Sequence, residues 1–334
     1  MPAPIPQDRP IRWGILGAGG IASKVAADIA RAEGNILAAV GARSAERAAD
    51  FASRFAIPRS YGNYQQLVDD PELDVIYVAT THPSHHDQAL MAVQAGKAVL
   101  IEKPVCLNAA QATAVFDAAR AADVFAMEAM WMRTNPLIGT AQRLIADGAI
   151  GDVVAVRAEL GLGRSFDPTH RLYDMANGGG ALLDLGIYPV TFGWLFLGRP
   201  DTVSTMGSLA PTGSDASVAM QWGYSDGRDA QLSCSAPHAM PNRGLILGTR
   251  GWVQTQGRFY RPTGLTVLSD GEQTELPDPI GPESAGYGPE VAEVARCLRA
   301  GLVESPVIPH ADTIAILGLL DDARAELGVR YPGE

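Results

Sequence analysis

The stretch RWGILGAGGIA, residues 12–22, joins a short apolar run to a glycine-rich turn. It matches the pattern G-x-G-x-x-[G/A], in which Gly17 permits a tight turn and Gly19 lets backbone N–H groups approach a pyrophosphate. The helix expected next adds the partial positive charge of its N-terminus. The chain holds 36 glycines, so a purely structural turn is the alternative. The dinucleotide-binding residues predicted in this turn are Gly17, Gly19, Gly20, Ile21 and Ala22.

The first third of the chain alternates short apolar runs with alanine-rich stretches. Each run suits a parallel strand buried on both faces, and each stretch between runs favours a helix. Repeated β-α-β units predict an N-terminal domain, residues 1–128, built on a doubly wound parallel sheet of Rossmann type. We expect strands at Arg12–Leu16, Ile36–Gly41, Val75–Ala79, Ala98–Glu102 and Val124–Glu128, and helices at Ala22–Ala32, Ser44–Phe55, His86–Ala95 and Asn108–Ala121.

The remaining residues, 129–334, have a different pattern. Several runs alternate apolar and polar residues and are joined by turn-rich linkers such as YSDGRD and LGTRG. This pattern predicts an α/β domain on an open, mainly antiparallel sheet, with one helical insertion and two amphipathic helices near the end of the sequence. Strands are expected at Val153–Leu160, Val218–Tyr224, Ala230–Ser235, Gly244–Leu247, Trp252–Gln256 and Leu265–Ser269, and helices at Ala181–Leu197, Glu290–Ala300 and Asp312–Leu327.

Composition argues against several classes of function. The net charge is −11 and no run is rich in lysine or arginine, so binding to nucleic acid or to an anionic membrane is disfavoured. The opening MPAPIPQDRP lacks the apolar core of a signal peptide. Three widely spaced cysteines form no metal-binding pattern, which favours reduced thiols and no metal site. We therefore expect a cytoplasmic protein with no membrane-spanning segment.

The end of the second expected strand indicates which dinucleotide binds. An NAD site usually places Asp or Glu there, but this chain reads GARS, residues 41–44. Arg43 and Ser44 suit a 2′-phosphate, since a guanidinium binds phosphate through a planar fork. The alternative is a solvated arginine beside a serine that caps its helix. We predict NADP, with Thr80 and His82 lining the cofactor cleft at the carboxyl end of another strand.

Two further motifs carry polar side chains suited to chemistry. Glu102 and Lys103 end a strand at the crevice and are predicted to contact the cofactor. A lysine there can also stabilise a developing alkoxide; a solvated loop lysine is the alternative. The run GGGALLDLGIYP, residues 178–189, brings its backbone close to another surface before a helix starts. Asp184 and Tyr188 are four residues apart and would share a helical face, unless they are an ordinary partly buried pair.

The order GAGGIA, EKP, MEAMWMR and GGGALLDLGIYP resembles the Gfo/Idh/MocA oxidoreductases across most of the chain. Within that family the chain looks most like the branch of dimeric dihydrodiol dehydrogenases and NADP-dependent D-xylose dehydrogenases. An aldose–aldose oxidoreductase that retains NADP is also similar. Residues Glu128, Ala129, Trp131, Arg133 and Glu304–Pro309 carry the resemblance to the branch.

The resemblance implies a Rossmann domain, a second domain whose open sheet packs against a partner subunit, and a catalytic lysine at Lys103. Many relatives have His at the position of Tyr188. The tyrosine of this chain agrees instead with the dihydrodiol branch, where tyrosine is the acid/base. Position 134 is Thr where the branch often has Phe, so substrate preference is not carried across.

The resulting hypothesis is hydride transfer between NADP and the C1 hydroxyl or carbonyl of an aldose such as D-xylose or D-glucose. Tyr188 exchanges the hydroxyl proton, Lys103 positions the reacting oxygen, and Asp184 orients Lys103 or a neighbouring hydroxyl. A tyrosine in water has a pKa of about 10, so nearby positive charge is needed to favour phenolate. Further residues predicted to line the substrate pocket are Trp131, Arg133, Phe166, Arg171 and Tyr173. For His170, contact with substrate and exposure to solvent are both open alternatives.

Three other functions remain open at this point. One is an aldose–aldose oxidoreductase with tightly retained NADP, and another is a trans-dihydrodiol dehydrogenase. The third belongs to a different class, a non-catalytic sensor that binds NADP and a protein partner. Retention of both Lys103 and Tyr188 argues against the sensor.

Overall fold

The chain, seen in a computed structural model that describes residues 2–281 and 284–332, folds into two compact units. The first contains Met1–Thr134 and Pro282–Ile314, and the second contains Asn135–Gly281 and Ala315–Glu334. The expected division at 128/129 lies close to the first crossing between units. The sequence analysis did not predict that the chain returns to the first unit after the antiparallel sheet. Helical periodicity near the C-terminus does not reveal which hydrophobic core a helix joins.

The first unit contains a six-stranded sheet in the order β3-β2-β1-β4-β5-β6, with all neighbouring strands parallel. The doubly wound Rossmann sheet is thereby confirmed. The strands are β1 (Ile11–Leu16), β2 (Asn35–Gly41), β3 (Arg59–Tyr61), β4 (Val75–Val78), β5 (Ala98–Glu102) and β6 (Ala126–Ala129). Only β3 was not expected, since its three residues are too short to show a pattern.

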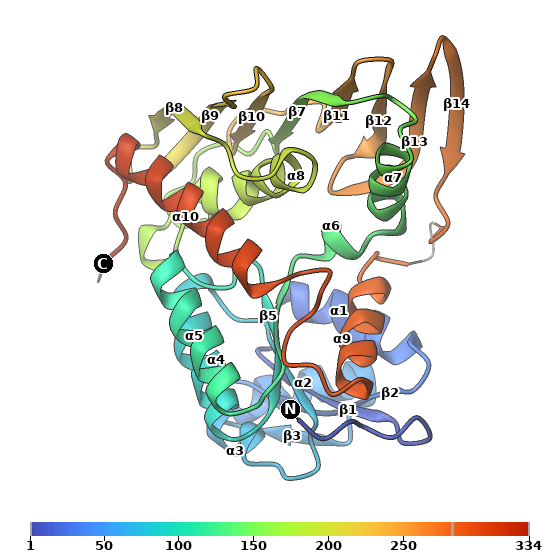
Figure 1. The fold of residues 1–334 in the computed structure, drawn as a ribbon. Helices are drawn as coiled ribbons and strands as arrows, with labels where there is room; N and C mark the ends of the chain where they lie inside the picture. The colour runs from blue at the N-terminus through green and yellow to red at the C-terminus, as the bar shows by residue number, and fades with distance from the viewer. Residues whose placement is uncertain (1, 282–283, 333–334) are drawn as a thin grey trace. The chain divides into compact units, whose positions relative to one another are not determined.

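Helices link these strands, and Figure 1 shows α4 and α5 on one side of β5 with α1 and α9 on the other. Asparagine or serine side chains start several of them: Ser44, Asn63 and Asn108 each accept a hydrogen bond from an N–H in the first turn of the helix that follows. The helices are α1 (Gly20–Arg31), α2 (Ala45–Phe55), α3 (Tyr64–Val68), α4 (His85–Gln94), α5 (Ala109–Ala121), α6 (Trp131–Thr134) and the 3₁₀ turn η1 (His82–Ser84).

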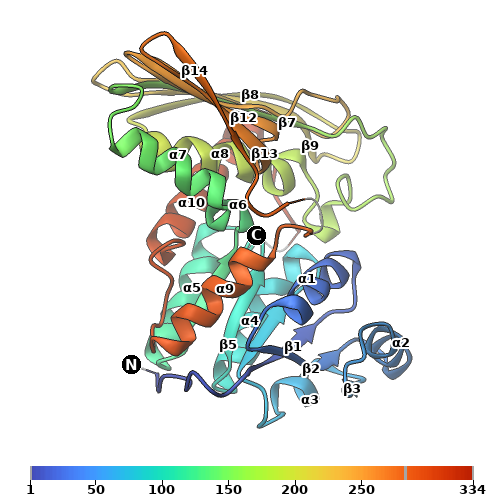
Figure 2. The ribbon, with the colours of Figure 1, turned by 90° about the vertical axis from the view of Figure 1, so that its right-hand side faces the viewer.

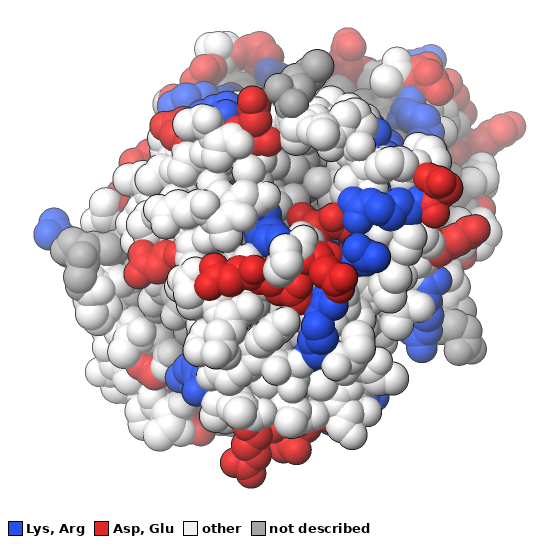
Figure 3. Space-filling model, turned by 90° about the horizontal axis from the view of Figure 1, so that it is seen from below, with Lys and Arg blue, Asp and Glu red and all other residues white. Residues whose placement is uncertain are grey.

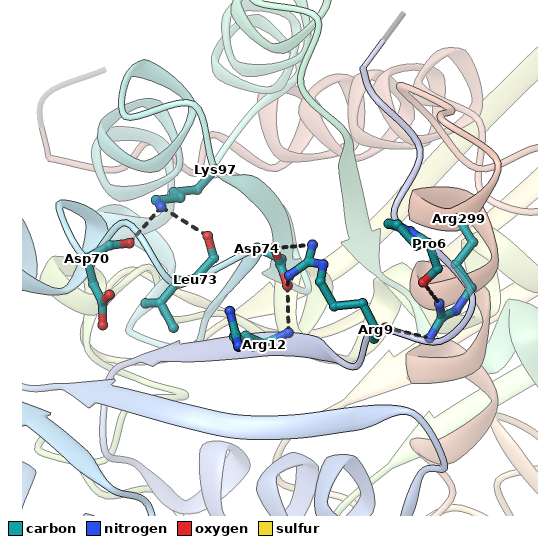
Figure 4. A network of polar contacts seen from close by, with 8 residues as sticks. All are labelled: Pro6, Arg9, Arg12, Asp70, Leu73, Asp74, Lys97 and Arg299. Atoms are coloured by element: carbon teal, nitrogen blue, oxygen red, sulfur yellow. Dashed lines mark hydrogen bonds and ion pairs between the residues drawn. The ribbon is translucent and has the colours of Figure 1, made fainter.

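The returning segment includes α9 (Gly288–Arg299), which is tied to the N-terminal region by polar contacts. Figure 4 shows Arg299 donating to the carbonyl oxygens of Pro6 at 2.6 Å and Arg9 at 3.3 Å. The carboxylate of Asp28 on α1 accepts the N–H of Tyr287 at 2.8 Å, just before α9 begins. These contacts tie α9 and the residues just before it to the first unit.

Figure 4 also shows a second set of polar contacts, at the amino ends of β1 and β4. Arg9 forms an ion pair with Asp74 at 2.8 Å, and Asp74 also accepts the N–H of Arg12 at 2.8 Å. The ammonium group of Lys97 donates to the carbonyl oxygens of Asp70 and Leu73. This end of the sheet is therefore fixed by polar contacts.

The second unit is built on an eight-stranded sheet in the order β14-β13-β12-β11-β7-β10-β9-β8. Only the pair β7–β10 is parallel, so the expected mainly antiparallel sheet is confirmed. The strands are β7 (Val153–Gly161), β8 (Thr202–Leu209), β9 (Asp215–Gly223), β10 (Asp229–Ser235), β11 (Gly244–Gly248), β12 (Gly251–Arg258), β13 (Arg261–Ser269) and β14 (Glu272–Pro277).

One face of this sheet is covered by α7 (Pro136–Ala146) and α8 (Ile187–Leu197), as Figure 2 shows. The second-unit part of α10 (His310–Leu327) contributes Glu326, which accepts the N–H of Thr205 on β8 at 3.0 Å. No helix within the described residues of this unit covers the opposite face. There Trp252 and Leu245 are only half-buried, whereas Val253 on the covered face is fully buried.

The stretch Met175–Leu197 meets the length and hydropathy expected of a membrane span, with a mean hydropathy of 1.4, which the sequence analysis did not anticipate. However, 83% of the most apolar 18-residue part of this stretch is buried inside the protein, as in the core helix of a globular domain.

On the face of the molecule in Figure 3, acidic and basic side chains lie interspersed among neutral ones.

Candidate active site

The glycine turn between β1 and α1 is shaped to admit a ligand. Gly17 has φ +109°, and a Cβ there would lie 2.8 Å from the carbonyl oxygen of Ala79. Gly19 precedes α1 without a side-chain cap, the first helical turn carries no acidic residue, and a Cβ on Gly20 would meet no atom within 4 Å. The lack of a side-chain cap and of acidic residues, together with the room beside Gly20, fits a pyrophosphate at the start of α1.

The loop from β2 to α2 holds the residues predicted to select NADP. Ser44 caps α2, with its hydroxyl accepting the N–H of Arg47 at 3.3 Å, and Arg43 is exposed. Burial raises the pKa of the Tyr64 phenol, and the positive charges of Arg43 and Arg47 oppose that rise. Two guanidinium groups therefore lie near the same phenol. Sequence analysis singled out only Arg43, because Arg47 falls inside an ordinary helical stretch.

A buried histidine joins the loops that follow β4 and β5. The ring nitrogens of His85 lie 2.9 Å from the carbonyl oxygen of Pro104 and 3.3 Å from that of Thr80. Burial lowers the pKa of His85, and the positive charge of Lys103 lowers it further. His82 is itself buried, with its ring centroid 5.8 Å from that of His85. Sequence analysis missed His85 because a histidine beside the start of a helix gives no sign of a contact with a distant segment.

The strand end before Lys103 is lined by buried acidic groups. The Tyr77 hydroxyl donates to Glu102 at 2.5 Å, and burial together with the charge of Glu102 raises the pKa of Tyr77 well above its ordinary value. Glu290 on α9 is fully buried and neither carboxyl oxygen has a hydrogen-bond partner. Burial, assisted by the charge of Glu102, raises the pKa of Glu290 well above its usual range. Lys103 is half-buried.

Glu128 connects three segments of the first unit. One carboxyl oxygen accepts the N–H of Val105 at 3.0 Å, two residues after Lys103, and the other accepts the Thr313 hydroxyl at 3.3 Å. Burial raises the pKa of Glu128 to about 7, against the effect of these hydrogen bonds. The side chain thus links the loop carrying Lys103 to the start of α10.

Two predicted pocket residues, Trp131 and Arg133, make contacts inside the first unit. The Trp131 ring stacks on Tyr287 with centroids 4.4 Å apart, and Arg133 forms an ion pair with Asp312 at 2.6 Å. Both residues are 9% exposed. The returning segment supplies both partners, which gives this motif a structural role. Contact of Trp131 and Arg133 with substrate stays a prediction.

In the second unit, the predicted helix carrying Asp184 and Tyr188 begins with a π-helical turn, η3 (Leu182–Gly186), before α8. The argument that a four-residue spacing places both side chains on one face assumed an α-helix throughout. Asp184 is buried and accepts a hydrogen bond from the exposed Arg171 at 3.0 Å, so the structure joins two predicted residues. π-Helical turns are frequent at functional sites.

Aromatic side chains surround this part of the second unit. Phe166 is 44% exposed and meets Tyr173 edge-on at 5.1 Å, and the Tyr173 hydroxyl donates to the carbonyl oxygen of Arg164 at 2.7 Å. Tyr188 is buried, with its ring centroid 4.9 Å from that of Tyr260. Tyr260 lies in the turn between β12 and β13, and nothing in the sequence pattern connected it to α8.

Across residues 2–281 and 284–332, no group of three or more His, Cys, Asp or Glu side chains is placed to hold a metal ion. The three cysteines, Cys106, Cys234 and Cys297, are buried and free. Burial raises the pKa of each thiol, so none carries the thiolate of a reactive cysteine at neutral pH.

Comparison with known proteins agrees with this arrangement. Residues 11–130 match the model of an oxidoreductase family with an NAD-binding Rossmann fold, and residues 138–254 match the Gfo/Idh/MocA C-terminal domain. A trans-1,2-dihydrobenzene-1,2-diol dehydrogenase of Mus musculus is 38% identical over 333 residues, covering 96% of this chain and 98% of that protein. Its Homo sapiens counterpart is 37% identical, with the same coverage.

Solved structures share the fold. An aldose-aldose oxidoreductase from Caulobacter crescentus, complexed with glycerol, gives a TM-score of 0.85 at 24% identity, covering 95% of this chain and 98% of that one. A 3-ketoreductase from Actinomadura kijaniata, complexed with NADP and TDP-benzene, gives 0.83 at 24% identity with the same coverage. The chain is an oxidoreductase that depends on NAD or NADP, and with both domains matched and relatives similar along nearly its whole length, it belongs to the Gfo/Idh/MocA family.

Proposed function

We propose that this oxidoreductase uses NADP and acts on the C1 hydroxyl or carbonyl of an aldose such as D-xylose or D-glucose. The observation that carries the proposal is the polar group of the second unit, in which the buried Asp184 is bonded to the exposed Arg171, with Tyr188 four residues further along the chain. A carboxylate, a guanidinium and a phenol are suited to binding and deprotonating a polyhydroxylated substrate. The exposed ring of Phe166 adds a flat apolar surface of the kind that packs against a sugar.

The residues around the glycine turn fit NADP. The uncapped first turn of α1 would hold the pyrophosphate, and Arg43 with Ser44 would hold the 2′-phosphate. Arg47 adds a second positive charge to this loop. The nicotinamide ring, when bound, supplies or accepts the hydride.

The remaining chemistry belongs to the protein's own side chains. In the oxidative direction Tyr188 removes the proton from the substrate hydroxyl, and in the reductive direction it returns that proton to the same oxygen. Lys103 donates a hydrogen bond to the reacting oxygen and stabilises the charge that develops there. Asp184, fixed by Arg171, orients a neighbouring hydroxyl or Lys103.

A second candidate is oxidation of a trans-dihydrodiol, which is favoured by relatives named trans-1,2-dihydrobenzene-1,2-diol dehydrogenase at 36–39% identity.

We also propose an oligomeric state and a cellular location for the protein. We expect a homodimer formed through the uncovered face of the second-unit sheet, since a broad sheet face with half-buried Trp252 and Leu245 needs cover. A cytoplasmic location is supported by the three free thiols.

The experiment is an absorbance spectrum and mass analysis of freshly purified protein before and after adding D-xylose, D-glucose or trans-1,2-dihydrobenzene-1,2-diol. Turnover of added NADP with a sugar supports the aldose proposal, and turnover with the diol alone overturns it in favour of the second candidate. Bound NADP that is reduced stoichiometrically and not released indicates sugar–sugar exchange. No response to any of the three substrates contradicts both candidates.

The acid/base assignment has its own test in Tyr188→Phe, which keeps the ring and removes the proton. Turnover should be abolished while NADP affinity, measured by fluorescence titration, is unchanged. Tyr224→Phe is the matched control, because the Tyr224 phenol donates to the carbonyl oxygen of Gly198. An active Tyr188→Phe variant would rule out Tyr188 as the acid/base.

A further inference from the structure

A buried carboxylate lies behind the helical segment that carries Asp184 and Tyr188. Asp215, the first residue of β9, is fully buried, and its Oδ2 accepts the N–H of Leu182 at 2.5 Å. Leu182 opens the π-helical turn. The N–H groups of Ala181 and Leu182 both act to lower the pKa of Asp215, so both face the carboxylate. The negative charge therefore lies at the N-terminal end of the segment, where a helix favours it.

The glycine before this turn is required by the same carboxylate. Gly180 has φ +137°, and a Cβ there would lie 2.3 Å from Oδ1 of Asp215. No side chain other than hydrogen fits between the backbone and that oxygen. The sequence indicated that the glycine run passes close to another surface, and for Gly180 that surface is the carboxylate of Asp215. Gly179 instead approaches the backbone of Arg171 and Asp174.

Burial of the Asp215 carboxylate is unfavourable for the ionised form. Oδ1 of Asp215 has no hydrogen-bond partner, and burial raises the pKa of the carboxyl group to about 6 despite the opposing N–H groups. Arg324 on the second-unit part of α10 also opposes the rise, and the Cys234 thiol faces the carboxylate from β10. A well-packed apolar residue would avoid this cost. What the carboxylate provides is a fixed start for the turn.

We propose that Asp215 is a positioning residue that anchors the start of the segment Ala181–Leu197 and so holds Asp184 and Tyr188 in place. Leu182 is two residues before Asp184 and six before Tyr188. Release of the Leu182 N–H would let the π-helical turn relax and shift both side chains. The positioning role rests on the function proposed above. The anchoring itself is a property of the second unit alone.

The test compares Asp215→Asn and Asp215→Ala with wild type in the full chain. Hydrogen exchange of a peptide spanning residues 178–190 reads the anchor directly, while steady-state kinetics and NADP affinity read its consequence. We expect faster exchange at residues 181 and 182 in both variants. We also expect a kcat lower by about 10- to 100-fold, a smaller change in KM for substrate, and unchanged NADP affinity. Asp229→Asn, another carboxylate on this sheet, is the control.

A pH series separates positioning from a general loss of structure. In wild type, the protection factor at residues 181 and 182, which is the exchange rate corrected for the intrinsic effect of pH, should drop as pH falls through about 6, where the Asp215 carboxylate takes up a proton. Asp215→Asn should lack that step. Gly180→Ala, which displaces Oδ1, gives a second route to the same phenotype if Asp215→Ala does not fold.

Unchanged exchange at residues 181 and 182 in Asp215→Asn and Gly180→Ala would overturn the anchor, and faster exchange with wild-type kcat would overturn the positioning role. If wild-type protein turns over neither sugar nor diol, the proposed function fails, and the exchange measurement alone decides whether Asp215 anchors the turn.

Discussion

Single residues at the ends of strands carry the proposal that this enzyme binds NADP. Arg43 stands where an NAD-dependent protein of this fold usually has a carboxylate, and Gly17 stands where a side chain would strike the carbonyl oxygen of Ala79. The location of both residues after β1 and β2 agrees with the sequence analysis, because a strand followed by a glycine turn has a fixed geometry, while their contact with NADP stays a prediction. His85, Tyr260 and Asp215 were not predictable, because their partners come from distant segments and leave no local pattern in the sequence.

Arg43→Ala should raise the KM for NADP by about 10- to 100-fold, because a guanidinium bonded to a phosphate contributes roughly 1.5–3 kcal/mol. The KM for NAD, which lacks the 2′-phosphate, should change little. Initial rates with each dinucleotide provide the measurement. Arg54→Ala, at the other end of α2, is the control. An equal change for both dinucleotides would show that Arg43 does not bind the 2′-phosphate.

Gly17→Ala should destabilise the protein by roughly 1–3 kcal/mol, since it combines a positive φ with a Cβ too close to a backbone oxygen. Urea denaturation followed by circular dichroism measures the loss. Gly318→Ala in α10, where a Cβ would meet no atom within 4 Å, should instead be neutral or stabilising by up to about 1 kcal/mol. Equal stability of the two variants would contradict the packing at Gly17.

Elements were predictable to the extent that their residues are buried. β5 was expected at its observed bounds, since every residue in it is buried and apolar except the terminal Glu102. The edge strands β8 and β14 were missed, because most of their side chains are exposed and show no apolar alternation. The π-helical turn was missed because its sequence is indistinguishable from that of an α-helix. The carboxylate of Asp215 on β9, which accepts the N–H of the first residue of this turn, comes from a distant segment and leaves no local pattern in the sequence.

Glu128 on β6 makes stability depend on pH. Its folded pKa of about 7 lies above the value of an unfolded glutamate, so folding takes up a proton between about pH 4.5 and 7. The stability is greatest at acidic pH and is lost as pH rises through this range, by an amount on the order of 3 kcal/mol. Glu128→Gln should remove that contribution.

Urea denaturation of wild type and Glu128→Gln at pH 5 and pH 8 provides the measurement. The variant should gain stability relative to wild type between the two pH values, and the comparison cancels other buried acids such as Glu290. A difference that does not change with pH would show that Glu128 is already ionised at pH 5.

At the scale of the whole molecule, the uncovered face of the eight-stranded sheet is the feature with the clearest consequence for assembly. Light scattering on wild-type protein should give the mass of a dimer. Trp252→Glu combined with Leu245→Glu places charges on that face and should give a monomer that keeps its circular dichroism spectrum. Val307→Glu, at an exposed apolar residue of the first unit, is the control. A wild-type monomer would contradict the proposed dimer.

The return of residues 282–314 to the first unit governs the order in which this protein can be completed on the ribosome. The β-α-β part is synthesised first, but α9 and the start of α10 emerge only after the entire antiparallel sheet. Until then Asp28 lacks the N–H of Tyr287, and Glu128 lacks the hydroxyl of Thr313. The first unit therefore stays incomplete while the second unit is synthesised. Its apolar surface is accessible to chaperones for longer than in a protein whose domains are each continuous in sequence.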